Sequence, residues 1–261
     1  MLETYFNEML ELLPKINDWN ISKNTTEAEL RALMTSARDK TLSVFKNLKD
    51  YKSEKRRVLE FLYNIGLLKN HEFSLLKDVN LKYLNLRNIH LEGANLSEAN
   101  FSFSDFSFSN LSNTYLNKSY FSACIFKEAN LTNADCRFSC FNQSVFCGNM
   151  LFYGKHFSES FFASSKRSIR IEKTKSADLS NANFNHAQFN QANLGGVQLT
   201  NASMVNSNLK EANLIDAKLP KADLTEADLE LADFSNANLE GANLKGTNRK
   251  DTKIDPQSLD H

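Results

Sequence analysis

A basic segment is the first place where this sequence could do chemistry. Residues 147–176 carry six basic and two acidic side chains, a net charge of +4. Lys166, Arg167 and Arg170 lie within it and could bind the phosphate groups of a nucleic acid or a lipid. No aromatic side chain lies between them and no glycine-rich loop accompanies them, so a solvated insertion is the interpretation that we prefer. We therefore expect no direct binding of nucleic acid.

The last part of the chain is acidic. Residues 177–261 carry seven basic and twelve acidic side chains, a net charge of −5. Asp223, Asp228 and Asp233 recur in it at steps of five and are candidate contacts for a partner protein. A carboxylate serves as a general acid or base when burial raises its pKa, and these residues are expected on outer turns, in water. Neither a serine, histidine and acid at suitable positions nor a phosphate-binding glycine loop is present, so we predict no catalytic residue and no cofactor.

The four cysteines do not form a metal site. Their spacings of 12, 4 and 7 residues lack the paired close ligands of a zinc centre, and the five histidines are scattered. Two of the cysteines, Cys124 and Cys136, fall at positions expected to point inward, where a thiol acts as a small apolar side chain. The sequence therefore predicts reduced, buried thiols and no bound metal.

The elements that must position these residues come from a five-residue period. A large apolar residue returns at every fifth position from Leu81 to Phe146, and again, in a new phase, from Leu179 to Leu244. A small residue stands two positions before most of these centres. Neither a helix nor a flat strand keeps residues five apart on one face, because their periods are about 3.6 and 2. The chain must turn regularly and stack its turns, as solenoid proteins do.

The repeated motif Ala-(Asn/Asp)-Leu-x-x resembles the pentapeptide-repeat family. It is seen at Ala94-Asn95-Leu96 and at Ala222-Asp223-Leu224. The resemblance implies a mainly β fold, a right-handed quadrilateral β-helix with four pentapeptides per coil. Residues 20 apart should then stack, which places Phe101, Phe121 and Phe141 in one ladder and Phe106, Phe126 and Phe146 in a second. Asparagine before the centre suits a turn, because its side chain can bond the nearby backbone.

The domain organisation follows from where this period starts and stops. We expect an α-helical cap domain at 1–72 and a β-helix at 73–254. The β-helix divides into arrays at 76–146 and 177–254, separated by an irregular insertion at 147–176 in which one or two distorted coils persist.

Three helices are expected in the cap. Apolar residues at steps of three or four run from Leu2 to Ile16, a capping box formed by Thr26 and Glu29 opens a second helix, and a third ends near Gly66. The third should cover the open first coil with apolar residues: Phe61, Leu62, Ile65 and Leu68. Residues 41–68 resemble the helical leader of some pentapeptide-repeat proteins. Many of those relatives carry membrane spans ahead of the leader, which this sequence does not.

Three phenylalanines break the polar pattern of the outward positions. Phe103, Phe108 and Phe138 stand two residues after a centre, where the repeat points outward. If exposed together they would mark a partner site, and the alternative is that they fold against the cap or the insertion. The apolar period decays after Leu244, so the far end is either a charged, frayed terminus or the contact of a homodimer.

The function that we predict is a non-enzymatic protein–protein interaction scaffold with an unidentified partner. Balanced charge, with 31 basic and 31 acidic residues, gives no global field toward nucleic acid or membrane. No apolar run reaches the roughly 20 residues of a membrane span and no signal sequence opens the chain, so we expect a soluble cytoplasmic protein. The resemblance suggests one alternative, a DNA-mimic regulator of a type II topoisomerase, for which a net charge of −5 is weak. A module that self-associates through open coil ends is the other alternative.

Overall fold

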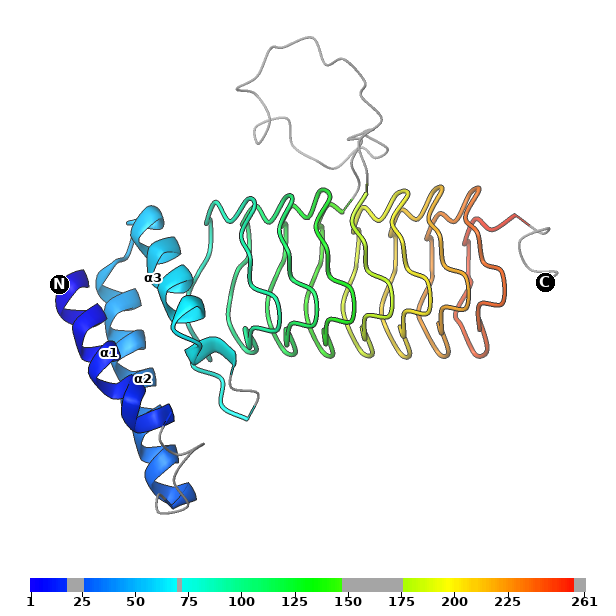
Figure 1. Ribbon diagram of the computed structural model, residues 1–261. Helices are drawn as coiled ribbons and strands as arrows, with labels where there is room; N and C mark the ends of the chain where they lie inside the picture. The colour runs from blue at the N-terminus through cyan, green and yellow to red at the C-terminus, as the bar shows by residue number, and fades with distance from the viewer. Residues whose placement is uncertain (18–25, 70–71, 147–175, 256–261) are drawn as a thin grey trace, which may run out of the picture.

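A helical N-terminal part is followed by a long tube of stacked coils (Figure 1). The computed structural model describes residues 1–17, 26–69, 72–146 and 176–255. Helices α1 (Leu2–Asn17), α2 (Glu27–Asn47) and α3 (Lys52–Asn64) precede a short 3₁₀ turn, η2 (Leu67–Lys69). Among the described residues, none of the helices has both the length and the apolar character needed to cross a bilayer.

Helix α2 begins with the capping box that the sequence predicts. The Thr26 hydroxyl oxygen accepts the N–H of Glu29 at 3.3 Å, and the Glu29 carboxylate accepts the N–H of Thr26 at 2.7 Å. These two bonds satisfy N–H groups that a helix start leaves free, which is worth about 1 kcal/mol. Helix α1 then packs on α2, where the Tyr5 hydroxyl lies 2.9 Å from that of Thr41 in the buried interface.

The tube has a period of 20 residues. Isolated parallel β-bridges join Asn80 to Asn100, Asn100 to Tyr120 and so on along four columns. Each side of a coil is so short that a single residue makes the bridge, which is why no longer strand forms. We name the sides by their bridged residues: side A (80, 100, 120, 140, 188, 208, 228, 248), side B (85, 105, 125, 145, 193, 213, 233, 253), side C (90, 110, 130, 178, 198, 218, 238) and side D (95, 115, 135, 183, 203, 223, 243).

Each coil passes through sides A, B, C and D in that order. A complete coil has 20 residues, and coil 4 also includes the segment that follows Phe146. The coils are coil 1 (79–98), coil 2 (99–118), coil 3 (119–138), coil 4 (139–186), coil 5 (187–206), coil 6 (207–226), coil 7 (227–246) and a partial coil 8 (247–255).

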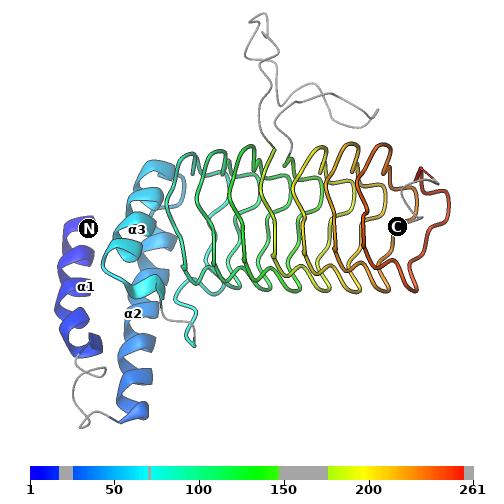
Figure 2. The ribbon, with the colours of Figure 1, turned by 45° about the vertical axis from the view of Figure 1, so that its right-hand side comes forward.

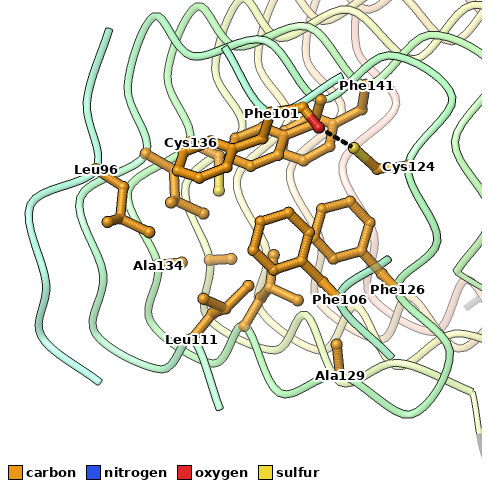
Figure 3. Packing of buried hydrophobic residues seen from close by; sticks show 14 of the residues in the cluster. Leu96, Phe101, Phe106, Leu111, Cys124, Phe126, Ala129, Ala134, Cys136 and Phe141 are labelled. Atoms are coloured by element: carbon orange, nitrogen blue, oxygen red, sulfur yellow. Dashed lines mark hydrogen bonds between the residues drawn. The ribbon is translucent and has the colours of Figure 1, made fainter. Parts of the chain in front are cut away.

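Phenylalanine rings stack along the interior of the tube (Figure 3). On side A the rings of Phe101 and Phe121 are 5.4 Å apart, and those of Phe121 and Phe141 are 5.0 Å apart, all nearly parallel. On side B, Phe126 lies 5.2 Å from Phe106 and 4.7 Å from Phe146. All of these side chains are fully buried, and the two ladders predicted from the sequence are confirmed.

The corners between the sides are tight turns with one unusual residue each. At the corner after Phe126, the N–H of Ala129 donates to the Phe126 carbonyl at 3.0 Å, and Glu128 between them has a φ of +54°. A positive φ at the third residue of a four-residue turn is the mark of a type II turn, which favours glycine or asparagine there. The same conformation is found at every described corner, and at most of them a larger residue adopts it.

An asparagine or aspartate before the centre stabilises most of these coils. The Oδ1 of Asn100 accepts the N–H of Ser102 at 3.1 Å, and the Oδ1 of Asn130 accepts the N–H of Thr132 at 2.9 Å. The same bond recurs on all four sides, with Asp105, Asn110, Asn193 and Asp228 as further acceptors. This bond to the residue two positions on is the backbone role expected of asparagine from the sequence.

The two arrays form one continuous tube. Asn130 bridges Asp178 directly, although the two are 48 residues apart in sequence, and the ring of Phe141 stacks on that of Phe189 at 5.1 Å. The N–H of Ala177 donates to the Phe146 carbonyl at 3.0 Å, and this bond joins the two arrays at the corner between sides B and C of coil 4. Coils 3, 4 and 5 therefore stack directly on one another, with no further coil between them among the described residues. The sequence predicts one or two distorted coils within the insertion, and residues 147–175 lie outside the described residues.

Helix α3 covers the open end of coil 1 (Figure 2). In later coils the carbonyls just before and just after each centre accept backbone N–H groups from the preceding coil, as those of Asn100 and Ser102 do from Leu81 and Tyr83. Coil 1 has no preceding coil, and side chains of α3 replace those donors. Lys55 Nζ donates to the Asn80 carbonyl at 3.3 Å. Arg56 Nη1 donates to the carbonyls of Asn85 and Arg87 at 3.0 and 3.3 Å, and the Tyr63 hydroxyl to that of Glu92 at 3.1 Å.

The apolar plug beneath α3 is close to the predicted one, with one difference. Leu62 and Leu68 are buried, together with Val58 and Leu59. Phe61 instead lies against α1, where its ring is 4.3 Å from that of Phe6. It joins the helices to one another and does not fill the tube.

Candidate interaction surface

Phe103 lies at the corner between sides A and B and is partly exposed, at 38%. Its ring stacks on Tyr83 of the coil before, with centroids 4.9 Å apart and planes within 10°. Lys52 of α3 places its ammonium 5.3 Å from the centre of the Tyr83 ring. Tyr83 and Phe103 therefore form a stacked aromatic pair on the outside of coils 1 and 2, next to the ammonium of Lys52.

Phe108 lies one corner further along coil 2, between sides B and C. The guanidinium of Arg87 lies 4.9 Å from its ring centre, and the ammonium of Lys127 lies 5.6 Å away. A ring held between two cations is attractive electrostatically, because the face of the ring is its negative part. Arg87 also pairs with Asp105 at 3.1 Å.

Phe138 occupies a third corner, between sides D and A. More than half of it is exposed, at 56%, and its ring stacks on His186 at 4.8 Å, with planes within 3°. The three predicted phenylalanines thus flank sides A and B from three corners. Phe103 and Phe108 adopt φ angles of +65° and +62°, and Phe138 one of +60°, a conformation that is unfavourable for a bulky side chain.

The three candidate aspartates lie on different sides of the tube. Asp223 is on side D, Asp228 on side A and Asp233 on side B. Their carboxylates accept backbone N–H groups two residues on, at 3.0, 3.1 and 3.0 Å, as the asparagines do.

All three aspartates have further bonds. Asp223 accepts a hydrogen bond from the hydroxyl of Thr225 at 2.5 Å. Asp228 accepts one from the side-chain amide of Asn248 at 2.9 Å, and Asp233 pairs with Lys253 at 2.9 Å. Hydrogen bonds from Ser235 and Lys253 keep the pKa of Asp233 below its ordinary value although burial acts to raise it. These contacts indicate that the three aspartates stabilise the coils.

The basic candidates Lys166, Arg167 and Arg170 lie outside the described residues. The described part of the chain stops at Phe146 and resumes at Ser176, at the corner between sides B and C of coil 4. The segment that carries these residues is therefore attached next to side B.

The buried cysteines are part of the core. Cys124 and Cys136 are fully buried, and burial raises the pKa of both thiols. Cys124 Sγ lies 3.1 Å from the carbonyl oxygen of Phe101, as Figure 3 shows. Within the described part of the chain, no three histidine, cysteine or acidic residues are placed to hold a metal ion. A buried thiol with a raised pKa is unreactive, so we assign Cys124 and Cys136 a role in packing and none in catalysis.

Sequence reasoning missed a group of outward apolar residues on sides A and B. Tyr120 and Cys140 bridge each other on side A, and Ile125 and Val145 on side B. Tyr120 is exposed at 53%. These four residues stand in the position where most other repeats have the asparagine or aspartate that bonds the backbone. That substitution was visible in the sequence as a break in the position before the centre.

Comparisons with known proteins agree with this geometry. A family model described as pentapeptide repeats matches eight copies, at residues 74–107, 109–147, 177–214 and 207–246. No curated protein matches the chain significantly.

Solved structures resemble the chain to different degrees. A trypsin-treated form of QnrB1, a plasmid-mediated fluoroquinolone resistance protein, is 18% identical with a TM-score of 0.52, over 72% of this chain and 86% of that one. Rfr23, a pentapeptide repeat protein from the cyanobacterium Cyanothece 51142, is 28% identical over 48% of this chain and 64% of its own, with a TM-score of 0.30. HetL from Nostoc sp. strain PCC 7120, described as involved in heterocyst differentiation regulation, is 24% identical over 74% and 92%, with a TM-score of 0.26.

The likeness to QnrB1 shows the fold, a right-handed β-helix, and at this identity shows no more than the fold. The family model covers more than half of the chain, and its copies coincide with the coils on both sides of the insertion. The protein belongs to the pentapeptide-repeat family.

Proposed function

We propose that this protein is a cytoplasmic, non-enzymatic scaffold that binds another protein through the outside of its tube. The observation that carries the proposal is the set of large aromatic residues at the corners, of which Phe103 and Phe138 are exposed and Phe108 is partly buried. Glycine or asparagine would fit these positive φ angles with less strain. A ring that stays in contact with water also contributes little to the stability of the tube. An aromatic ring there is explained better by contact with a partner than by the stability of the tube.

The alternative of a DNA-mimic topoisomerase regulator has less support. Such mimicry needs a continuous negative surface, since duplex DNA presents one phosphate per about 1.7 Å. Asp223, Asp228 and Asp233 lie on three sides and bond the backbone, and nearby Glu230 pairs with two lysines, Lys210 and Lys250, at 3.1 Å each. A supercoiling assay with a type II topoisomerase tests this alternative, and inhibition or drug protection at stoichiometric protein would favour it over the scaffold.

Self-association remains the other alternative, and it depends on the last coils. Leu244 and Ala242 are partly exposed, whereas Leu224 and Ala222 above them are buried. The next inward position on side A is filled by Arg249, which is exposed, so charge replaces the leucine of the earlier coils. Sedimentation at increasing concentration decides between a charged terminus and a dimer, because only a dimer doubles the mass.

Site-specific photo-crosslinking tests the scaffold itself. A crosslinking residue is placed in turn at the outward position of each side of coil 3, at positions 120, 125, 130 and 135. If the proposal holds, one specific protein of the host is captured from one side or from two adjacent sides. The double variant Phe103→Ser, Phe108→Ser should abolish this capture. Absence of a specific adduct from all four sides, in a folded protein, would overturn the proposal.

A further inference from the structure

We infer that sides A and B of coils 1–4 bind an acidic segment of a partner protein that also carries apolar side chains. This inference rests on the proposed scaffold function and names the place and the chemistry of the contact. The outer apolar surface is defined here as Tyr83, Phe103, Phe108, Tyr120, Ile125 and Val145.

The residues of this surface lie next to one another by the register of the tube. Ile125 and Val145 are bridged to each other on side B. On side A, Tyr120 of coil 3 is bridged to Asn100 of coil 2, and Phe103 stands three residues after Asn100. Phe103 occupies the corner that joins the two sides and donates its N–H to the carbonyl of Ser122 at 2.9 Å. Six large side chains therefore face outward over two adjoining sides.

The apolar residues replace a bond that the repeat makes elsewhere. On sides A and B, the asparagines of coils 1 and 2, such as Asn85 and Asn100, accept the N–H two residues on. Sides A and B of coils 3 and 4 have tyrosine, cysteine, isoleucine and valine in that position. Sides C and D of coil 3 keep the bond, through Asn130 and Asp135. The bond is also absent where other residue types stand in this position, at His90, Tyr115, Gln188, Gln198, Ser203, Lys218 and Lys253. Only sides A and B of coils 3 and 4, among the described coils, have four apolar residues there in adjoining positions, as expected if contact with a ligand determines these residues.

The charges around this surface are mostly positive. Lys52, Lys82, Arg87 and Lys127 surround the rings, and two carboxylates, Asp105 and Glu128, lie among them. Asp105 is paired with Arg87. Among the described residues, Lys52, Lys82 and Lys127 have no carboxylate within ion-pair distance. A ligand with carboxylates beside apolar side chains would meet both the free cations and the exposed rings.

Two other occupants fit less well. Single-stranded nucleic acid stacks its bases on aromatic rings along a strongly positive groove, and the aliphatic Ile125 and Val145 offer no stacking face. The two carboxylates, Asp105 and Glu128, would also repel phosphates. Residues 147–176 carry a net charge of +4 and so lack the charge complementary to the lysines of this surface.

The experiment measures binding of four fluorescent probes to the full-length protein by anisotropy, at low and at high salt. The probes are a peptide alternating glutamate with leucine and phenylalanine, the same peptide with lysine for glutamate, the same peptide with serine for the apolar residues, and single-stranded oligothymidylate. The first peptide should bind at least about tenfold more tightly than the other three, and high salt should weaken it.

Variants that restore the repeat show where the peptide binds. The triple variant Tyr120→Asn, Ile125→Asn, Val145→Asn places acceptors beside the N–H groups of Ser122 and Lys127, so it should unfold at the same or a higher urea concentration. It should also weaken the acidic apolar peptide by about tenfold or more. The variant Lys82→Gln, Lys127→Gln should weaken binding at low salt and have less effect at high salt. The control Asn130→Val, on side C, should leave binding unchanged.

Each contrary result overturns the inference. Equal binding of the acidic and basic peptides, tighter binding of oligothymidylate, or unchanged affinity in the folded triple variant would each do so. The fate of the scaffold function is separate. A host protein crosslinked only from sides C or D would leave the function standing and refute this surface, whereas no adduct from any side would refute the function itself.

Discussion

Replacing the side chains with which α3 covers coil 1 tests whether a helix can substitute for a missing coil. The perturbation is the triple variant Lys55→Met, Arg56→Met, Tyr63→Phe. These changes keep most of the apolar volume of each side chain. They remove four hydrogen bonds to coil 1, to the carbonyls of Asn80, Asn85, Arg87 and Glu92, and also the ion pair of Arg56 with Glu60 within α3.

The magnitude follows from the geometry of these bonds. A hydrogen bond within a protein contributes about 1 kcal/mol net, so four would contribute about 4 kcal/mol. Burial lowers the pKa of the Lys55 ammonium, which shows that its charge is partly desolvated and that removing it recovers some free energy. Arg56 is half-buried and partly solvated. We therefore expect a loss of about 2–3 kcal/mol, which corresponds to roughly a hundredfold change in an opening equilibrium.

Hydrogen exchange of single amides measures where this loss occurs. The N–H groups of Leu81 and Leu86 in coil 1 donate to coil 2 at 2.7 and 2.8 Å and should lose protection by about a hundredfold. Those of Leu199 and Leu219, in coils 5 and 6, should change little, because each coil contacts only its neighbours. The control is Arg57→Met, at an exposed neighbouring position of α3.

Two results would refute this reasoning. Unchanged exchange in coil 1 would show that water satisfies its carbonyls as well as α3 does. An equal loss in all coils would show that the tube opens as a single cooperative unit and that the cap has no local role.

Three further perturbations test the interior and one turn. Phe121→Ala should lower the free energy of unfolding in urea by about 3–5 kcal/mol through the cavity it leaves between stacked rings, and a loss below about 1 kcal/mol would contradict their packing. Ala202→Leu fills a fully buried small position and should cost about 1–3 kcal/mol by overpacking, so an unchanged urea midpoint would show unexpected space there. The folded-state pKa of Asp233 is depressed, so the carboxylate contributes stability that is present above its unfolded value of about 3.9 and lost as the pH falls through the folded value. Asp233→Asn keeps an acceptor for the N–H of Ser235 and should reduce the loss of stability in acid below about pH 4 in thermal melts, whereas an identical acid profile would contradict the depressed pKa.

The inward residues could be predicted because packing repeats. Phe101, Phe121 and Phe141 recur at the period of the coil, and each must fit against the ring before it and the ring after it. The small residues beside them, such as Ala202, are constrained by the same narrow interior. The capping box at Thr26 could be predicted because it depends on a local backbone geometry alone.

The continuity of the tube across the insertion could not be predicted from the period. Successive coils repeat after 20 residues, and Asn130 and Asp178 are 48 apart, so 28 additional residues enter within one coil. They enter at a corner, where the chain is on the surface and the bonds of the sides stay intact. The energetic penalty for such a loop grows slowly with its length. The phase of the repeat changes in the sequence, and the register in space does not.

The orientation of Phe61 and the outward residues escaped prediction for different reasons. On α3, positions three and four apart face both the tube and α1, and the helical pattern alone does not assign Phe61 to one of them. Tyr120, Ile125 and Val145 satisfy the β-preference of any strand position, so they do not disturb the period. What marks them in the sequence is the absence of the asparagine or aspartate that would bond the backbone from the same position.

The position of the outer apolar surface along the tube follows from how a solenoid is stabilised. A coil in such a protein is held by the coils on both sides of it, and a terminal coil lacks one of them. Coil 1 has α3 in place of that neighbour, and coils 2–4 have full coils on both sides. Coil 7 has only a partial coil beyond it, and side chains at its end, such as Leu244, are partly exposed. Rings placed on coils 1–4 are therefore held by the best supported part of the tube. A rigid surface loses less conformational entropy on binding, so this is where exposed aromatic residues gain the most affinity for a partner.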